Sequence, residues 1–339
     1  MPRTNPPWEI KRENLTKTED MTNPKFGYTP LERPAEEYIK YGVINLDKPA
    51  GPTSHEVAAW TKKILKLTAI GHGGTLDPQV TGVLPVTLEE STKIVQALLY
   101  TGKEYICVMK LHGDVDENNV CRVLAEFEDL IYQRPPLRSS VKRQIRTRRV
   151  YYNEFIEMDG RNVLFKVGCE GGTYIRKLCY DMGEILGVGA HMQELRRTRA
   201  GPFTENSSTH VNLHDIAYWF DEYQTKKDPT ILHKFIQPME TALELIPKIT
   251  VRDSAVDALC HGASLTAPGV VTVDTQIQKD TLVAIMTLKG EVITLSKAVE
   301  STEQILNLEH GIIATPERVI MPRGTYPKVW KTGKENDQK

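Results

Sequence analysis

The residues best placed for chemistry lie in one glycine-rich segment. Residues 71–82 contain four glycines, one histidine (His72) and one acid (Asp77), which Pro78 follows directly. Such a density of glycine indicates a contorted or closely approached backbone, so the one carboxylate is held in a fixed place. A fixed carboxylate can attack an electrophile, stabilise a developing positive charge or abstract a proton. A capping aspartate in a turn is the alternative interpretation.

Three other kinds of site are excluded for this segment. It has neither the Gly-Lys-Ser/Thr ending of a phosphate loop nor the Gly-x-Gly-x-x-Gly spacing of a dinucleotide site. One histidine and one carboxylate are too few to hold a metal ion. The five cysteines are scattered and lack a zinc-ribbon spacing, so we interpret them as buried small side chains in a reducing compartment. We therefore expect no metal and no cofactor.

A second candidate feature is a run of positive charge. Residues 134–149, here called the basic segment, hold seven basic residues and no acid, although the net charge of the chain is only −1. Concentrated positive charge of this kind is typical of segments that neutralise the phosphates of a nucleic acid. A solvated loop is the alternative interpretation.

The elements that must position these residues follow from periodicity. Ser54 can cap a helix whose apolar residues recur at spacings of three and four, and this helix should end near Thr68. Asp159-Gly160 is a strong hairpin turn signal. The further elements expected are strands at 41–46 and 104–111, a helix at 90–99, the hairpin strands at 150–158 and 162–169, and a helix at 174–186.

The chain length of 339 residues predicts two folded units. Residues 1–40 are rich in proline and charge and indicate an extended arm. Short apolar runs separated by glycine and proline predict a small all-β unit after a boundary near 247, followed by a tail at 326–339. The sequence has no apolar run of the length a membrane helix needs and no signal-peptide core, so a cytoplasmic protein is expected.

The glycine-rich segment resembles the catalytic motif of TruB-family pseudouridine synthases. The resemblance is closer to the archaeal and eukaryotic branch that includes dyskerin, the catalytic subunit of box H/ACA ribonucleoproteins. Further blocks occur in the family's order: residues 48–54 resemble its lysine-proline motif, 103–105 its tyrosine motif, and 172–176 with 195–197 its third block. The resemblance covers about residues 38–325.

The resemblance implies an α+β fold. Residues 41–247 would form a catalytic domain with a mixed, largely antiparallel central sheet flanked by helices. Residues 248–325 would form a small β-barrel of the PUA type, which the arm wraps. The basic segment would be a mobile thumb loop that closes on RNA.

The resemblance also implies roles for individual residues. Asp77 would be catalytic, Tyr105 would lie against the target base, and Arg176 would pair with Asp77 in a site shielded from water. His72 would help occupy the gap left by a flipped nucleotide. The other residues implied to contact RNA are Lys48, Tyr174, Leu195, Arg138, Lys142, Arg143, Arg146, Gly262 and Ala263.

The implied activity is isomerisation of uridine to pseudouridine in rRNA or tRNA. One hypothesis is a guide-RNA-directed subunit of an H/ACA particle, with a zinc-binding small protein, a glycine-arginine-rich-type protein and a kink-turn-binding ribosomal-type protein as partners. A second is a stand-alone enzyme acting on the T-loop uridine of tRNA. A third, a non-catalytic RNA-binding or assembly protein, is disfavoured by intact Asp77, Tyr105 and Arg176. The first chemical step of Asp77 stays open between attack at the sugar, attack at C6 and proton abstraction at C2′.

Overall fold

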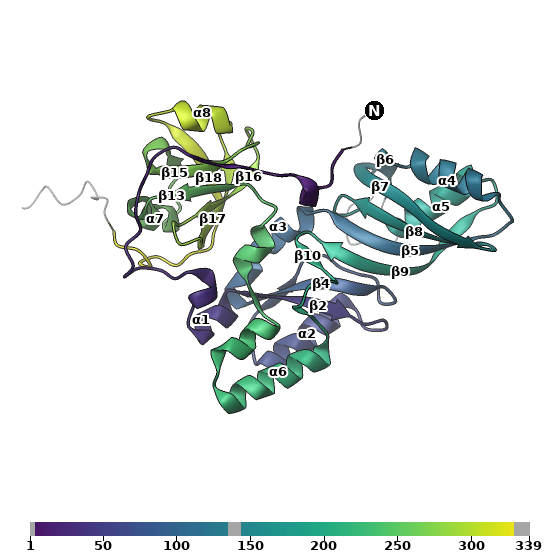
Figure 1. Cartoon of the computed structure of the whole chain (residues 1–339), viewed down its shortest axis with the longest axis horizontal. Coiled ribbons are helices and arrows are strands. Elements are labelled where there is room, and N and C mark those ends of the chain that lie inside the picture. The colour runs from purple at the N-terminus through teal and green to yellow at the C-terminus, as the bar shows by residue number, and fades with distance from the viewer. Residues whose placement is uncertain (1–3, 135–143, 329–339) are drawn as a thin grey trace, which may run out of the picture. The chain divides into compact units, whose positions relative to one another are not determined.

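The computed structural model describes residues 4–134 and 144–328, which form two compact units (Figure 1). The first unit contains the segment up to Ile10 and Gly42–Gln237, and the second contains Lys11–Tyr41 and the chain from Pro238 onward. The C-terminal part of the second unit thus begins at Pro238, ahead of the boundary predicted near 247. Arg138, Lys142 and Arg143 lie outside the described residues.

The first unit is built on a mixed sheet in the order β11-β2-β4-β9-β5-β8-β7-β6, with β3 beside β4 and β10 beside β9. The pairs β11–β2 and β4–β9 are parallel, and the other pairs among these strands are antiparallel, which confirms the predicted fold class. The strands are β2 (Gly42–Lys48), β3 (Ile70–His72), β4 (Thr81–Leu88), β5 (Lys103–Leu111), β6 (Asp129–Gln133), β7 (Arg146–Asp159), β8 (Asn162–Cys169), β9 (Ala190–Ala200), β10 (Phe203–Thr204) and β11 (His210–Val211).

Helices flank this sheet. Periodicity located α2 and α5 well, whereas the helix expected at 90–99 is a 3-10 turn, η3 (Glu89–Ile94), continued by α3. The strands β4 and β9 were not predicted, because their sequences lack the polar-apolar alternation that marks a half-exposed strand. The α-helices of this unit are α2 (Ser54–Leu65), α3 (Val95–Tyr100), α4 (Glu117–Glu126), α5 (Ile175–Ile185) and α6 (Leu213–Lys226), and the other 3-10 turns are η1 (Pro7–Glu9) and η4 (Pro229–Lys234).

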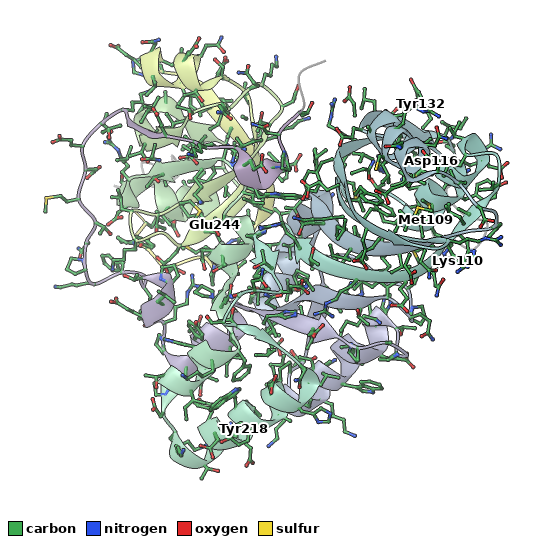
Figure 2. All side chains as sticks on the ribbon, turned by 45° about the vertical axis from the view of Figure 1, so that its right-hand side comes forward. Met109, Lys110, Asp116, Tyr132, Tyr218 and Glu244 are labelled. Carbon is green, nitrogen blue, oxygen red and sulfur yellow. The ribbon has the colours of Figure 1, made fainter. Side chains whose placement is uncertain are left out.

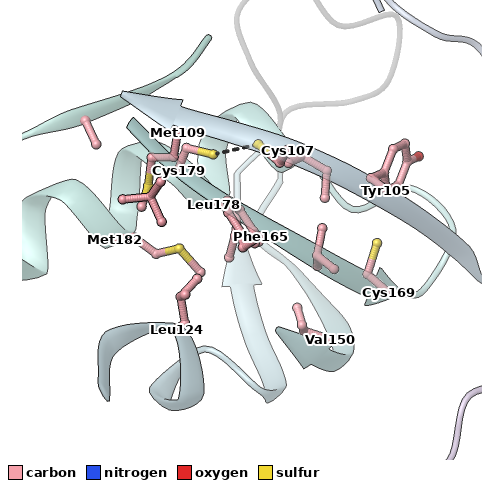
Figure 3. Close-up of a cluster of buried hydrophobic side chains, with 14 of the residues drawn as sticks. Tyr105, Cys107, Met109, Leu124, Val150, Phe165, Cys169, Leu178, Cys179 and Met182 are labelled. Atoms are coloured by element: carbon pink, nitrogen blue, oxygen red, sulfur yellow. Dashed lines mark hydrogen bonds between the residues drawn. The ribbon is translucent and has the colours of Figure 1, made fainter. Parts of the chain in front are cut away.

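Strand β5 forms one side of the core of the first unit. Its residues alternate between buried and partly exposed, as shown by the neighbours Met109 and Lys110 (Figure 2). The buried face packs with α5, whose Leu178 and Met182 are fully enclosed (Figure 3). Because Tyr105 lies on this strand and Arg176 in the first turn of α5, the core fixes the two elements that carry these residues.

Two cysteines meet inside this core. The sulfur atoms of Cys107 and Cys179 are 3.6 Å apart and fully buried (Figure 3), and their contact, with burial, raises the pKa of the Cys107 thiol. Burial raises the pKa of Cys169 and of Cys260 to about 12. Cys121 alone among the five is partly exposed.

We therefore expect one thiol per chain to react with a maleimide in the native protein, because the other four thiols are buried and offer no access. Mass spectrometry should place the label on Cys121. A Cys121→Ala variant should stay unlabelled until denaturant is added. Rapid native labelling of Cys107 or Cys179 would contradict the packing.

The basic segment was predicted to be a loop throughout, and this is wrong for its last residues. Strand β7 begins at Arg146, where that residue pairs with Gln133 of β6. Two of its arginines already face acids: Arg149 forms an ion pair with Asp129, and Arg148 lies 3.9 Å from Glu170. The strand starts early because these residues find backbone partners on β6.

The second unit contains a seven-stranded sheet in the order β1-β15-β13-β16-β17-β18-β14. This second unit, which was predicted to be all-β after residue 247, also contains helices. Its strands are β1 (Asn14–Thr16), β13 (Lys248–Val251), β14 (Leu265–Thr266), β15 (Val270–Asp274), β16 (Leu282–Met286), β17 (Val292–Ala298) and β18 (Ile312–Val319), its α-helices are α1 (Ala35–Lys40), α7 (Asp253–Cys260) and α8 (Thr302–Asn307), and its 3-10 turns are η2 (Pro30–Glu32), η5 (Met239–Leu243) and η6 (Ala267–Gly269).

The arm is ordered by contacts within this unit. Strand β1 pairs with β15, and Lys17 donates a 2.6 Å hydrogen bond to the carbonyl of Ile305. Arg33 and Glu240 form a nearly enclosed ion pair with N–O distances of 2.7 and 2.9 Å. In the described ranges, none of the helices has the length and apolar character to cross a membrane.

Candidate active site

Asp77 lies in the loop between β3 and β4. The loop is held by backbone hydrogen bonds at both ends: Gly73 donates to Pro85, and Gly51 donates to the carbonyl of Pro78 at 2.9 Å. A turn in which Val80 donates to the Asp77 carbonyl closes it. The carboxylate is therefore presented by a fixed backbone, as the glycine density predicted.

The start of α2 fixes the residue before Asp77. The prediction that Ser54 caps this helix is wrong, because Thr53 is the N-cap and forms a capping box with Glu56. Ser54 is fully buried, and its hydroxyl accepts from the backbone N–H of Leu76 at 2.8 Å. Ser54, at the first helical position, is thus freed from capping and binds the loop that carries Asp77.

The side chain of Lys48 also holds this loop. Its ammonium is fully buried and donates to the carbonyls of Pro49, Pro78 and Val80 at 2.8 to 2.9 Å. Burial and the nearby charge of Arg197 lower its pKa. Because these three carbonyls use all three protons of the ammonium, Lys48 holds the backbone of the chain, which differs from the RNA contact that was implied.

Arg176 and Asp77 form an ion pair. Their side chains are 59% and 53% exposed, so the described part of the chain does not provide the expected shielding from water. The shielding fails because the arginine stands in the exposed first turn of α5 and the aspartate on a loop. A water-free site would need a bound molecule to cover the pair.

The N-terminus of α5 is held by a residue that sequence reasoning missed. The buried side-chain amide of Gln133 accepts from the backbone N–H of Tyr174 at 2.9 Å and donates to its carbonyl at 3.1 Å. Tyr174 precedes the helix, so this clamp sets the position from which Arg176 extends. A glutamine at the end of a short strand carries no sequence signal for such a role.

Tyr105 lies on β5 with 8% of its surface exposed, and Arg197 is its partner across the pairing of β5 with β9. Burial raises the pKa of the phenol. Arg197 is 1% exposed and was not among the predicted site residues. Its place in the third block of the resemblance was the only signal for it.

Comparisons with known proteins show the family of this chain. Residues 62–175 match the model described as "TruB family pseudouridylate synthase (N terminal domain)", and 176–244 match "tRNA pseudouridylate synthase B C-terminal domain". "Probable tRNA pseudouridine synthase B" of Methanopyrus kandleri is 57% identical over 96% of this chain and 95% of its own. The chain belongs to the TruB family. It is a pseudouridine synthase.

The second unit and the arm match their own models. Residues 247–320 match "PUA domain" and residues 5–58 match "DKCLD (NUC011) domain". Two solved structures resemble this TruB-family chain over 96% of its length. "Crystal Structure of a Cbf5-Nop10-Gar1 Complex" is 54% identical with a TM-score of 0.92, covering 99% of that chain. "Structure of H/ACA RNP bound to a substrate RNA containing 2'-deoxyuridine" is 51% identical with a TM-score of 0.90, covering all of that chain.

His72 lies on β3, beside the loop that carries Asp77. Its ring meets that of His55 edge to face, with 4.8 Å between centroids. Burial, followed by the neighbouring His55 and Arg197, lowers the pKa of His72 to about 4. The imidazole of this TruB-family chain is therefore neutral at physiological pH.

The other implied RNA contacts lie at several places. Leu195 packs partly buried against the core of the first unit, and Arg146 starts β7. Gly262 and Ala263 belong to the second unit, in the turn after α7. Gly262 has φ +86°, and no atom lies within 4 Å of where its Cβ would stand, so this backbone is open to close approach.

A groove of about 1050 Å³ lies beside Arg176. Its lining includes Tyr132, Ile145 and Tyr180, which are at least half exposed. This apolar surface continues from the site along α5 and the ends of β6 and β7.

Proposed function

We propose that this chain is the catalytic subunit of a guide-RNA-directed H/ACA particle, with Asp77 as the catalytic carboxylate. The observation that carries the catalytic part is the Asp77–Arg176 ion pair on a loop clamped by Lys48 and Ser54. Arg176 orients the carboxylate, and Tyr105 stands on β5, which β9 separates from β4.

The reaction suits such a site. The bond from N1 of uracil to C1′ breaks, the base rotates, and a bond from C5 to C1′ forms while C5 loses a proton and N1 gains one. Glycosidic cleavage builds positive charge on the sugar, which an adjacent carboxylate can stabilise or attack. No electron is transferred to an acceptor. Tyr105 would stack on the base, a contact worth about 1–3 kcal/mol per base.

The target nucleotide must leave its stack before Asp77 can reach it, because C1′ and C5 are inaccessible inside a helix. The open surface around the ion pair gives such a nucleotide room, and the bound RNA would then cover the pair. The neutral, partly buried His72 would help fill the gap in the RNA without adding charge. Unstacking costs a few kcal/mol, which cationic contacts must offset.

The RNA substrate is recognised in one of two ways: through a guide RNA in an H/ACA particle, or by the chain alone on tRNA. Likeness to solved chains in complexes named with Nop10, Gar1 and substrate RNA supports the guided particle, in which small proteins and a guide RNA accompany this chain. The name tRNA pseudouridine synthase B of its relatives supports stand-alone action on tRNA. Gly262 and Ala263 would contact the guide RNA, and the cytoplasm is the location we propose.

The two candidates separate in one experiment. The purified full chain is incubated with unmodified tRNA and with an rRNA fragment, each with and without a guide RNA and the partner proteins. Pseudouridine is mapped by position. We expect modification of the rRNA fragment only in the guided mixture. Equal modification of the tRNA uridine by the chain alone would make the stand-alone activity the principal one.

The basic segment predicts a salt effect. Replacing Arg138, Lys142 and Arg143 by glutamine should weaken RNA binding and lower the slope of log affinity against log salt by about 2, because each phosphate contact contributes roughly 0.7–0.9. The slope is measured by filter binding between low and moderate salt. Lys226→Gln, on the exposed face of α6, is the matched control and should leave the slope unchanged. An unchanged slope in the triple variant would exclude a thumb role.

A further inference from the structure

Lys103, the first residue of β5, carries a buried ammonium without a counter-charge. It is 4% exposed and donates to the carbonyls of Leu98 and Thr101 at 2.9 and 2.8 Å and to the Thr101 hydroxyl at 3.0 Å. In the described ranges, no carboxylate is among its hydrogen-bond partners. Burial, followed by the charge of Arg197, lowers its pKa to about 7. Because burying an unpaired charge is costly, filling space is not a sufficient reason for a lysine here.

All three acceptors belong to residues 98–101, here called the α3 turn, which ends α3. This turn contacts the start of the Asp77 loop. A Cβ added at Gly73 would stand 3.0 Å from the Cβ of Leu98, and one added at Gly74 would stand 3.8 Å from Cε of Lys103. Leu98 is 1% exposed, so the turn packs directly on the backbone of the loop.

Arg197 ties the same loop to β9. Its Nη2 donates to the carbonyl of Gly74 at 3.2 Å, and its Nε donates to that of Val83 at 2.6 Å. Gly74 and Val83 stand on either side of Asp77 in the chain, so β9 holds both ends of the loop. The α3 turn adds a contact at the end where the loop begins.

The α3 turn also contacts the segment between β8 and α5. A Cβ added at Gly171 would stand 2.3 Å from the carbonyl oxygen of Leu99 and 3.1 Å from that of Thr101. The second oxygen is one of the acceptors of Lys103. Both oxygens belong to the backbone, so residue 171 must be glycine for the two segments to approach. The turn therefore touches the chain ahead of Asp77 and the chain ahead of Arg176.

We propose that Lys103 is a positioning residue for pseudouridine formation: by holding the α3 turn, it sets the spacing between the Asp77 loop and the segment that leads to Arg176. The inference rests on the proposed role of Asp77. The last carbonyls of a helix have no partner within the helix, and the ammonium supplies protons to two carbonyls of this turn. Without these bonds the turn would move, and the members of an ion pair 99 residues apart in the chain would lose a shared support.

The first test is the Lys103→Met variant of the full chain, because methionine nearly matches the lysine stem but donates no hydrogen bond. Under the condition above that supports activity, the single-turnover rate should fall by roughly 10–100-fold, since small misplacements of reacting groups have effects of this size. RNA affinity should stay within about 3-fold of the wild type. Lys110→Met, the same change on the partly exposed face of the same strand, is the control and should keep both values.

Hydrogen exchange separates positioning from a general loss of stability. The backbone N–H groups of Leu76 and Tyr174 donate to the Ser54 hydroxyl and the Gln133 amide, so each reports on one of the two segments. In Lys103→Met without RNA, exchange at 73–76 and at 171–174 should rise by roughly 10-fold, while α4 keeps its protection. Faster exchange in α4 to the same extent, or no change in either segment, would overturn the inference.

A second variant keeps the lysine and decides the matter if Lys103→Met does not fold. Thr101→Val removes a hydroxyl that accepts from Lys103 and donates to the Leu98 carbonyl at 2.8 Å. It should slow the single-turnover rate by about 2–10-fold, as expected for lost hydrogen bonds, and raise exchange in the same two segments. Wild-type rate and exchange in Thr101→Val would overturn the inference.

Failure of this inference and failure of the proposed function give different results. If Lys103→Met is as fast as the wild type while Asp77→Asn is inactive, the positioning role is wrong and the catalytic carboxylate stands. An active Asp77→Asn variant would instead refute the proposed function, whatever the exchange at 73–76 and 171–174.

Discussion

Asp77→Asn should lower the single-turnover rate of pseudouridine formation by roughly 1,000-fold or more, because an amide can neither attack the sugar nor accept a proton. The loop should keep its shape, since the bonds from Lys48 and Ser54 go to the backbone around Asp77 and not to its carboxylate. RNA affinity should stay within about 3-fold, as one carboxylate contributes little beside many phosphate contacts.

The matched control is Asp114→Asn, the same chemical change at an 87% exposed carboxylate that pairs with Arg161. It should leave both rate and affinity unchanged. The rate is measured by release of tritium from C5-labelled uridine with enzyme in excess. Sustained single-turnover activity in Asp77→Asn would remove the carboxylate from the mechanism, whatever the affinity.

Gly82→Ala should destabilise the first unit by about 3–5 kcal/mol, which combines backbone strain with overpacking. Gly82 has φ +102°, and a Cβ there would stand 2.2 Å from the carbonyl oxygen of Arg197. That oxygen belongs to the backbone of β9, which pairs with β4 at this residue, so it cannot move aside. The variant should also lose activity, because the same strand carries the Arg197 side chain.

The Gly160→Ala variant separates backbone strain from overpacking. Gly160 also has a positive φ, +55°, but no atom lies within 4 Å of its Cβ position in the turn between β7 and β8. Gly160→Ala should lower the free energy of unfolding by only about 1–2 kcal/mol, because alanine is strained in a left-handed backbone conformation. Denaturant titrations followed by tryptophan fluorescence compare the midpoints. Equal midpoints for the two variants would show that β4 and β9 approach less closely than described.

Much of the local structure followed from the sequence. A run of apolar, β-prone residues located β5, helical spacing located α2 and α5, and the Asp159-Gly160 turn located the hairpin of β7 and β8. These signals are local, because each depends on residues within one element. The density of glycine around Asp77 likewise marked a constrained loop before any contact was known.

Roles that depend on residues distant in the chain could not be obtained in this way. Ser54 reads as a helix cap, yet it binds Leu76, and Lys48 reads as an RNA contact, yet its protons are used by carbonyls of the Asp77 loop. Gln133 belongs to no motif, and Arg197 lies in the third block without any sign of what its side chain contacts. Their functions exist only because separate strands bring their side chains to one place.

The sequence by itself indicated the family, the candidate carboxylate Asp77 and the elements that carry Tyr105 and Arg176. The tertiary structure alone decided what holds them: buried donors on β2, α2 and β9 whose partners are backbone oxygens far along the chain. The physical reason is that a catalytic side chain is set by its covalent type, whereas its position is set by hydrogen bonds and packing that close only when the sheet forms.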